Sequence, residues 1–224
     1  MDSCVTAALA ARESDAYALH FSYGQRTEAR ELTASRAVAQ RLGFSDFLHL
    51  RIDVFRRIGG SALTDAKIAV PDAAADFGDV SPDAAGAEIP VTYVPFRNAH
   101  FLSAAVSWAE VLGATRVYIG AVEQDSSGYP DCRPAYYDAF RQVVRTGTRD
   151  GRIEILTPLI DKSKAQIVRL GLECSAPLDL TWSCYREEQL ACGTCESCVL
   201  RLRAFAAAGV EDPIAYAPTN PISD

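Results

Sequence analysis

Four cysteines near the C-terminus, in the run WSCYREEQLACGTCESC, have the residue type and spacing of a metal site. Cys192, Cys195 and Cys198 form two overlapping C-x-x-C pairs, and Cys184 lies eight residues upstream. Each C-x-x-C turn directs two thiolates at one point, and four thiolates complete the tetrahedron that Zn²⁺ prefers. Because sulfur fills every position, we predict one structural zinc ion per chain. Disulfides or four unliganded thiols are the alternatives.

The first residues of the chain suggest a site for an anion. Met1, Asp2 and Ser3 lead into an alanine-rich stretch that we expect to be helical. The unpaired N–H groups at a helix N-terminus attract phosphate. Asp2 could help to hold Mg²⁺, and Ser3 could donate a hydrogen bond to a phosphate oxygen. The alternative is an ordinary helix start, with Asp2 and Ser3 as capping residues.

Polar residues also gather in the runs FSYGQR and VPFRN, next to expected elements. Ser22 and Tyr23 follow a short apolar stretch, at the end of a strand where parallel α/β sheets bind ligands. Arg97 could bind a phosphate or a carboxylate through its planar guanidinium, and Asn98 is a natural helix cap. A tight turn and a cap beside a surface arginine are the alternatives.

The run IGAVEQDSSGYPDCRP is a long polar segment that follows another apolar stretch. Tyr129 could stack on a planar heterocycle, and Glu123 or Asp131 could accept hydrogen bonds from its ring N–H groups. Arg133 belongs to the same run. Further along, Lys164 stands at the expected start of a helix, where it could contact a phosphate. A solvent-exposed connection and a solvated lysine are the alternatives.

The pattern of apolar and polar residues predicts alternating helices and strands. Helices are expected at residues 3–12, 28–42, 98–112, 134–149, 163–170 and 198–208. Strands are expected at residues 17–21, 47–52, 117–119 and 153–156. Such alternation indicates an α/β fold, a Rossmann-like parallel sheet with flanking helices. We expect this domain at residues 1–176, a loop or lid within it at 65–90, and a small zinc-binding segment at 177–224.

The composition of the 224 residues argues against several classes of protein. No apolar run approaches the roughly 20 residues of a membrane helix, and no secretory leader is visible. The net charge of −7 disfavours broad binding to a nucleic-acid backbone, and seven cysteines suit a reducing cytoplasm better than a disulfide framework. We therefore expect a cytoplasmic protein of small-molecule ligands, without nucleic-acid or membrane partners. Its oligomeric state stays open, a homodimer included.

Several of these runs together resemble the 7-cyano-7-deazaguanine synthase family of queuosine biosynthesis, in the N-type ATP pyrophosphatase (PP-loop) superfamily. The matching runs are MDS, YGQR, GGSALTD, VPFRN, SGYPDCR, TPLIDKSKAQI, TWSCY and CGTCESCVLRLRAF, and they span nearly the whole chain in the family's order. The resemblance implies an α/β fold like that of adenine nucleotide alpha hydrolases and an ATP-dependent carbon–nitrogen ligase. Such an enzyme converts 7-carboxy-7-deazaguanine and ammonia to 7-cyano-7-deazaguanine, through an activated carboxylate and then an activated amide, with Mg²⁺ accompanying ATP.

The resemblance places several of these residues at one site, and their chemistry suggests individual roles for them. Asp2 and Ser3 match the end of the family's S-G-G-x-D-S phosphate loop, and with Lys164 they are expected to be catalytic. The expected ATP-binding residues are Met1, Asp2, Ser3, Cys4, Ser22, Tyr23, Arg97 and Asn98. The expected substrate-binding residues are Glu123, Tyr129, Asp131 and Arg133. The family's zinc ligands match Cys184, Cys192, Cys195 and Cys198.

The chain departs from the family pattern at its front, where the first strand and the Ser-Gly-Gly of the phosphate loop are missing. We hypothesise that an upstream reading frame encodes them. Two other functions stay open. One is another adenylating PP-loop enzyme, which would need a catalytic cysteine pair or a tRNA-binding extension. The other is a degenerate, non-catalytic relative that binds zinc or a nucleotide.

Overall fold

The computed structural model describes residues 1–73, 89–123 and 128–218. Within these ranges the helices are α1 (Asp2–Glu13), α2 (Glu28–Arg41), α3 (Val54–Ile58), α4 (Arg97–Leu112), α5 (Pro134–Gly147), α6 (Lys164–Glu173) and α7 (Glu196–Ala208). The strands are β1 (Tyr17–Ser22), β2 (Asp46–Arg51), β3 (Arg116–Tyr118) and β4 (Glu154–Leu156). Two short 3₁₀ helices, η1 (Pro130–Cys132) and η2 (Leu178–Leu180), complete the described elements.

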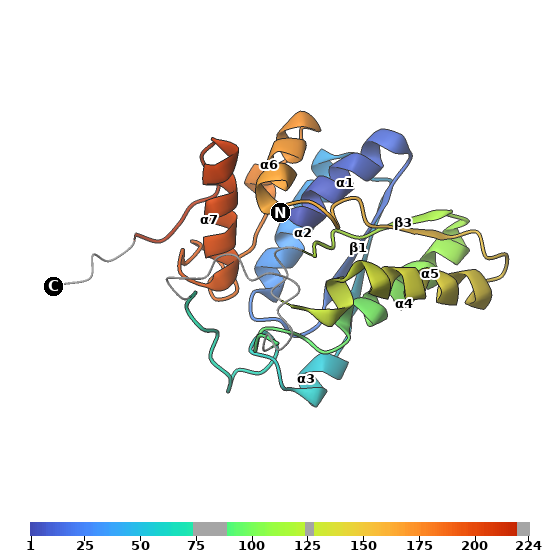
Figure 1. The fold of residues 1–224 in the computed structure, drawn as a ribbon, viewed down its shortest axis with the longest axis horizontal. Helices are drawn as coiled ribbons and strands as arrows, with labels where there is room; N and C mark the ends of the chain where they lie inside the picture. The colour runs from blue at the N-terminus through green and yellow to red at the C-terminus, as the bar shows by residue number, and fades with distance from the viewer. Residues whose placement is uncertain (74–88, 124–127, 219–224) are drawn as a thin grey trace.

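The strands are parallel and helices flank them, as the alternating pattern predicts (Figure 1). They do not join into one continuous sheet in the described part of the chain. Instead β1 pairs with β2, from Tyr17 opposite Asp46 to Ser22 opposite Arg51, and β3 pairs separately with β4. The predicted α/β fold is confirmed, and the sheet is divided into two parallel pairs.

A cavity of about 790 Å³ lies between the two strand pairs. Its lining includes Leu19 and Phe21 of β1, Val117 of β3 and Leu102 of α4, with further residues from α1 and α2. Apolar side chains of two strands thus face a shared space that no described element fills. We call this space the interstrand groove.

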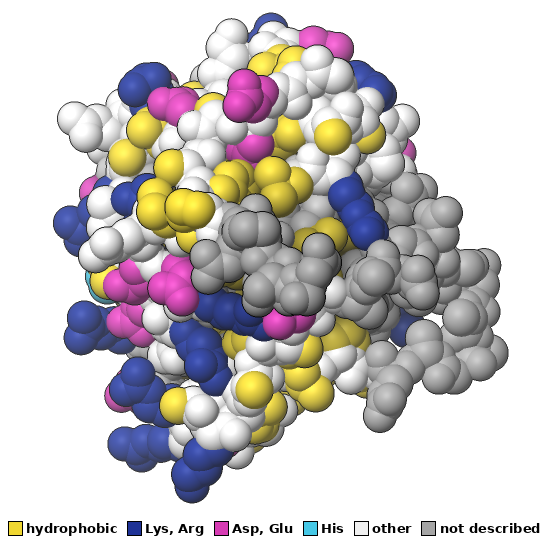
Figure 2. Space-filling model, turned by 90° about the vertical axis from the view of Figure 1, so that its left-hand side faces the viewer, with side chains coloured by type: hydrophobic (Ala, Val, Ile, Leu, Met, Phe, Trp, Pro, Cys, Tyr) yellow, Lys and Arg dark blue, Asp and Glu magenta, His cyan; other side chains and the backbone are white. Residues whose placement is uncertain are grey.

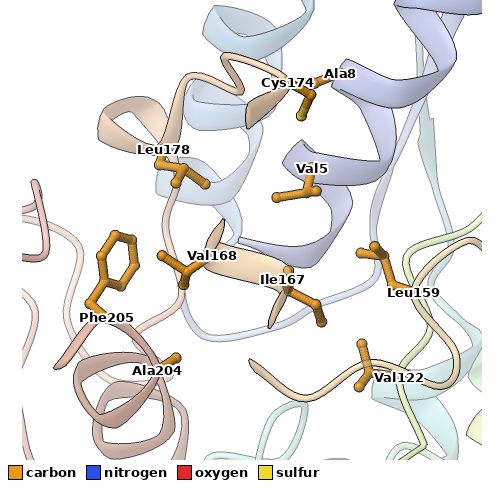
Figure 3. Packing of buried hydrophobic residues seen from close by; sticks show 10 residues of the cluster. All are labelled: Val5, Ala8, Val122, Leu159, Ile167, Val168, Cys174, Leu178, Ala204 and Phe205. Atoms are coloured by element: carbon orange, nitrogen blue, oxygen red, sulfur yellow. The ribbon is translucent and has the colours of Figure 1, made fainter. Parts of the chain in front are cut away.

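One hydrophobic core packs α1 against α6 and α7, although α1 is far from these two helices in the sequence (Figures 1 and 3). Val5, Ile167 and Phe205 belong to its fully or almost fully buried side chains. Helix α6 was expected to end at residue 170, but it continues through Gly171 to Glu173. A Cβ atom at residue 171 would lie 2.9 Å from the Val5 side chain, so the glycine allows α1 and α6 to approach closely.

Two of the helix caps that the sequence suggested are absent from the structure, and a third helix has a side-chain cap. The N-cap position of α1 is Met1, and neither Asp2 nor Ser3 caps the helix with its side chain. Asn98 is the second residue of α4, whose N-cap position is Phe96. Among the described helices, α6 is the one whose N-cap residue caps it with its own side chain, in a capping box in which Ser163 accepts from the backbone of Gln166 and Gln166 accepts from that of Ser163.

The C-terminal segment is tied down by a buried ion pair. Arg201 of α7 donates from Nε to Asp212 Oδ2 at 2.7 Å, and Tyr216 donates to the same oxygen at 2.6 Å.

Leu190 and Leu202, near the C-terminus, are large hydrophobic residues that are partly exposed at the surface. The face shown in Figure 2 carries small apolar patches among charged side chains. No helix within the described ranges has both the length and the apolar character to cross a membrane.

Candidate active site and metal site

The N-terminal ends of four helices meet at a cavity of about 300 Å³. Its lining includes residues from the start of α1, α4, α6 and α7, which are Met1, Asp2, Ser3, Arg97, Asn98, Lys164, Glu196 and Ser197. A helix N-terminus carries a partial positive charge and N–H groups without intrahelical partners. We call this cavity the helix-end pocket. The helix N-termini in its walls favour an anion.

Asp2 and Lys164 form an ion pair in the helix-end pocket. Lys164 Nζ donates to Asp2 Oδ2 at 2.7 Å, and the two side chains are 17% and 26% exposed, respectively. Burial by itself would raise the pKa of Asp2, but attraction to Lys164 and to the N-terminal ammonium group, together with the hydrogen bond from Lys164, lowers the pKa below its ordinary value. The carboxylate is therefore ionised at neutral pH. Its other oxygen, Oδ1, is buried without a hydrogen-bond partner in the described structure.

The end of β3 presses against the start of α1. A Cβ atom at Gly120 would lie 2.9 Å from the backbone nitrogen of Ser3 and 3.0 Å from the carbonyl carbon of Asp2. Only glycine leaves room for this contact. The backbone of Asp2 and Ser3 is thereby held at the carboxyl end of a parallel strand, the edge at which α/β folds bind ligands.

Arg97 brings an incompletely paired guanidinium into the same pocket. Its Nη1 donates to the hydroxyl of Tyr23 at 2.9 Å, and its guanidinium carbon lies 5.5 Å from the centre of the Tyr23 ring. Its Nε is buried without a hydrogen-bond partner among the described residues, and none of their ion pairs includes Arg97. An arginine in this state can bind an incoming carboxylate or phosphate.

Asp131 and Asn98 hold the start of α4 together. Asp131 Oδ2 accepts from the backbone N–H of Asn98 at 3.0 Å, and Asn98 Nδ2 donates to the Asp131 carbonyl at 2.9 Å. Asp131 is 3% exposed and does not line the helix-end pocket. The capping side chain of α4 thus comes from η1, which is distant in the sequence, and Asn98, which was expected to be the cap, anchors η1.

A group of polar and aromatic side chains forms one wall of the helix-end pocket. Tyr129, Tyr185 and Glu196 line it, and the Tyr129 hydroxyl lies 2.7 Å from Thr92 Oγ1. Burial, and to a smaller extent the charge of Glu196, raises the pKa of Tyr129 to about 12. The phenol is therefore protonated at neutral pH and can donate a hydrogen bond or stack on a planar ligand.

The other expected site residues lie elsewhere. Cys4 is buried, its thiol donates to the Pro177 carbonyl at 3.6 Å, and burial raises its pKa to about 11. Ser22 is 2.8 Å from the ring of His49, and Glu123 and Arg133 do not line the helix-end pocket. Tyr23 reaches the site through its contact with Arg97. Residues 124–127 of the polar run lie outside the described residues.

The four clustered cysteines have the geometry of a metal site. The Sγ atoms of Cys184, Cys192, Cys195 and Cys198 all lie within 4.8 Å of one another. Zn–S bonds of about 2.3 Å in a tetrahedron place the sulfurs about 3.8 Å apart. The distance between Cys192 Sγ and Cys198 Sγ is 3.9 Å, which suits such a tetrahedron and is far too long for a disulfide.

Backbone N–H groups surround these sulfurs. Cys184 Sγ accepts from Arg186 at 3.4 Å and from Glu187 at 3.3 Å, and Cys192 Sγ accepts from Cys195 at 3.3 Å. Donors of this kind stabilise thiolates, the form in which cysteine binds a metal. The cluster can therefore hold a metal ion, and its four-sulfur chemistry is the one that zinc prefers.

Comparisons with known proteins show the family of the chain. The family model for "Queuosine biosynthesis protein QueC" matches residues 1–209. A 7-cyano-7-deazaguanine synthase of Acidobacterium capsulatum is 70% identical, over 97% of this chain and 93% of that protein. The synthases of Koribacter versatilis and Chlorobaculum tepidum are 62% and 55% identical, over 97% and 96% of this chain and 90% and 92% of their own lengths. The chain belongs to the QueC family.

Proposed function

We propose that this protein is an ATP-dependent ligase that converts 7-carboxy-7-deazaguanine and ammonia to 7-cyano-7-deazaguanine in queuosine biosynthesis. The convergence of four helix N-termini, an ionised aspartate, a lysine and a partly buried arginine on one pocket is the observation that supports it most strongly. A triphosphate and a carboxylate both need such surroundings. The family membership and the curated names of the relatives point to the same reaction.

Two metal ions belong to the proposal. Zn²⁺ would bind Cys184, Cys192, Cys195 and Cys198 and would brace the start of α7, with no position left for substrate. Mg²⁺ would accompany ATP and neutralise part of its charge. The buried Oδ1 of Asp2, which lacks a hydrogen-bond partner in the described structure, is the available oxygen ligand for it.

The reaction needs two activation steps because carboxylate and amide oxygens are poor leaving groups. In the first, a carboxylate oxygen attacks a phosphorus of ATP and displaces pyrophosphate or ADP. Ammonia then attacks the carboxyl carbon, the activated oxygen leaves with the electron pair of its C–O bond, and the nitrogen loses one proton to give the amide. In the second, a further ATP activates the amide oxygen in the same way, this oxygen leaves with the electron pair of its C–O bond, and the nitrogen loses two protons to give the nitrile. Lys164, Arg97 and the N–H groups of α1 would stabilise the developing negative charge.

The interstrand groove has room for a further strand beside the helix-end pocket. We propose that it can accept an added, extended apolar strand, which would pair with the unpaired edges of β1 and β3 in the described structure. Such a strand would satisfy backbone groups on both strand pairs. The apolar lining by Leu19, Phe21 and Val117 is the feature that favours this occupant.

The proposed partners are small molecules, and the proposed location is the cytoplasm. ATP consumption that depends on added 7-carboxy-7-deazaguanine is the direct test of the proposed reaction. Nucleotide or acid binding without turnover would favour the degenerate relative instead.

Replacing Arg97→Lys is expected to raise the KM for 7-carboxy-7-deazaguanine about 10- to 100-fold, with little change in the KM for ATP. A planar guanidinium can donate two parallel hydrogen bonds to the substrate carboxylate, and loss of one hydrogen bond to a charged group costs about 1.5–3 kcal/mol. Steady-state kinetics with each substrate varied in turn measures the two constants.

Arg149→Lys is a matched control, because Arg149 is exposed and lines neither cavity. It should leave both constants unchanged. A rise in the KM for ATP alone in the Arg97→Lys variant would assign Arg97 to a phosphate and contradict its role on the carboxylate.

A further inference from the structure

Glu196 is a buried carboxylate whose position the cysteine motif around it does not explain. It stands between two metal-ligating cysteines, Cys195 and Cys198, and is the first residue of α7. Its side chain is only 8% exposed, yet it lines the helix-end pocket. A buried carboxylate costs free energy unless it has strong partners.

The described residues supply few partners for this carboxylate. Its only hydrogen bond there is from Thr92 Oγ1 to Oε2, and at 3.5 Å that bond is long. None of the ion pairs in the described structure includes Glu196. The N-terminus of α7 offsets part of the charge. An acceptor with unused lone pairs is therefore aimed into a pocket that also contains Tyr129 and Tyr185.

The proposed substrate has donors that fit such an acceptor. The six-membered ring of a guanine-like base presents a ring N–H and an exocyclic amino group side by side. A carboxylate accepts both at once, one hydrogen bond on each oxygen. Adenine has no such pair of adjacent donors on its Watson–Crick edge, so the same carboxylate discriminates against it.

We propose that Glu196 recognises the guanine-like edge of the substrate through two hydrogen bonds. We also propose that the metal knuckle, which is the four-cysteine cluster with its bound metal, positions this carboxylate. The inference rests on the proposed function and assigns it a specificity-determining residue. Cys195 and Cys198 flank Glu196 on the same turn, so a metal bound by them fixes the backbone from which the side chain reaches the pocket. The knuckle then serves recognition as well as stability.

The test compares two ligands on the metal-loaded chain by isothermal titration calorimetry. These are 7-carboxy-7-deazaguanine and the same acid without the exocyclic amino group, 7-carboxy-7-deazahypoxanthine. The unmodified chain should bind the amino-bearing acid about 10- to 100-fold more tightly. The Glu196→Gln variant should bind it about 10- to 100-fold more weakly than the unmodified chain and should lose most of that preference, since an amide has only one acceptor oxygen.

Glu188→Gln is the matched control, because Glu188 is exposed and also lies between two cysteines of the cluster. The control should change neither the affinity nor the preference, and both variants should retain the metal by elemental analysis. Equal binding of the two acids by the unmodified chain would overturn the inference without use of any variant. Retained preference in Glu196→Gln would overturn it as well.

The outcomes separate this inference from the proposed function. If the unmodified chain binds the acid and consumes ATP but shows no preference for the amino group, only the role of Glu196 fails. If it neither binds the acid nor consumes ATP, the proposed function fails, and the inference fails with it.

Discussion

The Cys195→Ser variant is expected to lose its metal and at least about 4 kcal/mol of its free energy of unfolding. Cys195 is fully buried, and its sulfur is one of four that would share a single zinc ion. Three remaining thiolates hold the ion far more weakly, and without it they repel one another. Elemental analysis of the purified variant and chemical denaturation measure the two effects.

A chelator should destabilise the unmodified chain in the same direction, because it removes the same ion. Cys174→Ser is the matched control, since Cys174 is also buried but lies outside the cluster and donates to the Gly171 carbonyl, a contact that serine can keep. The control should retain one zinc ion per chain. A Cys195→Ser variant with full metal content and unchanged stability would contradict the metal site.

Asp2→Asn is expected to lower the rate of ATP consumption about 10²- to 10³-fold while leaving the fold intact. The substitution removes the charged ligand proposed for Mg²⁺ and the partner of Lys164, whose Nζ is 2.7 Å from Asp2 Oδ2. An asparagine of the same size still fits between α1 and α6. Turnover measured over a range of Mg²⁺ concentrations would show the loss and its dependence on the metal.

Asp179→Asn provides the comparison, because Asp179 is exposed in η2 and lines neither cavity. Its rate should equal that of the unmodified chain. Thermal unfolding should show that both variants are folded. If Asp2→Asn turned over ATP at the full rate, the start of α1 would not be the phosphate site.

Local sequence patterns predicted the helices and strands well, because each carries its own signal. Helix α2 was expected at 28–42 and lies at Glu28–Arg41, and strand β1 was expected at 17–21 and lies at Tyr17–Ser22. The end of α6 was predicted too early, at residue 170 before Gly171, because a glycine that ends a helix and a glycine at a close helix–helix contact look alike in one sequence. Only its neighbour Val5, from α1, distinguishes them.

The metal cluster was predictable because all four ligands lie within one short segment. The helix-end pocket was predictable only in part, since its walls come from four helices whose arrangement no local motif encodes. Asp131 illustrates the difficulty, because its carboxylate also caps α4, a contact between distant residues that no local motif indicates. Glu196 was overlooked because it sits inside a metal motif, although a carboxylate between two ligand cysteines is a signal that could have been noticed.

Mass spectrometry of the products tests the central claim most directly. The zinc-loaded chain, and a version extended at its front by an apolar strand ending in Ser-Gly-Gly, are each mixed with ATP, Mg²⁺, ammonia and 7-carboxy-7-deazaguanine. We predict the nitrile product and acid-dependent loss of ATP, with the greater rate in the extended version. If the zinc-loaded, extended protein leaves both ATP and the acid unchanged, the proposed reaction is contradicted.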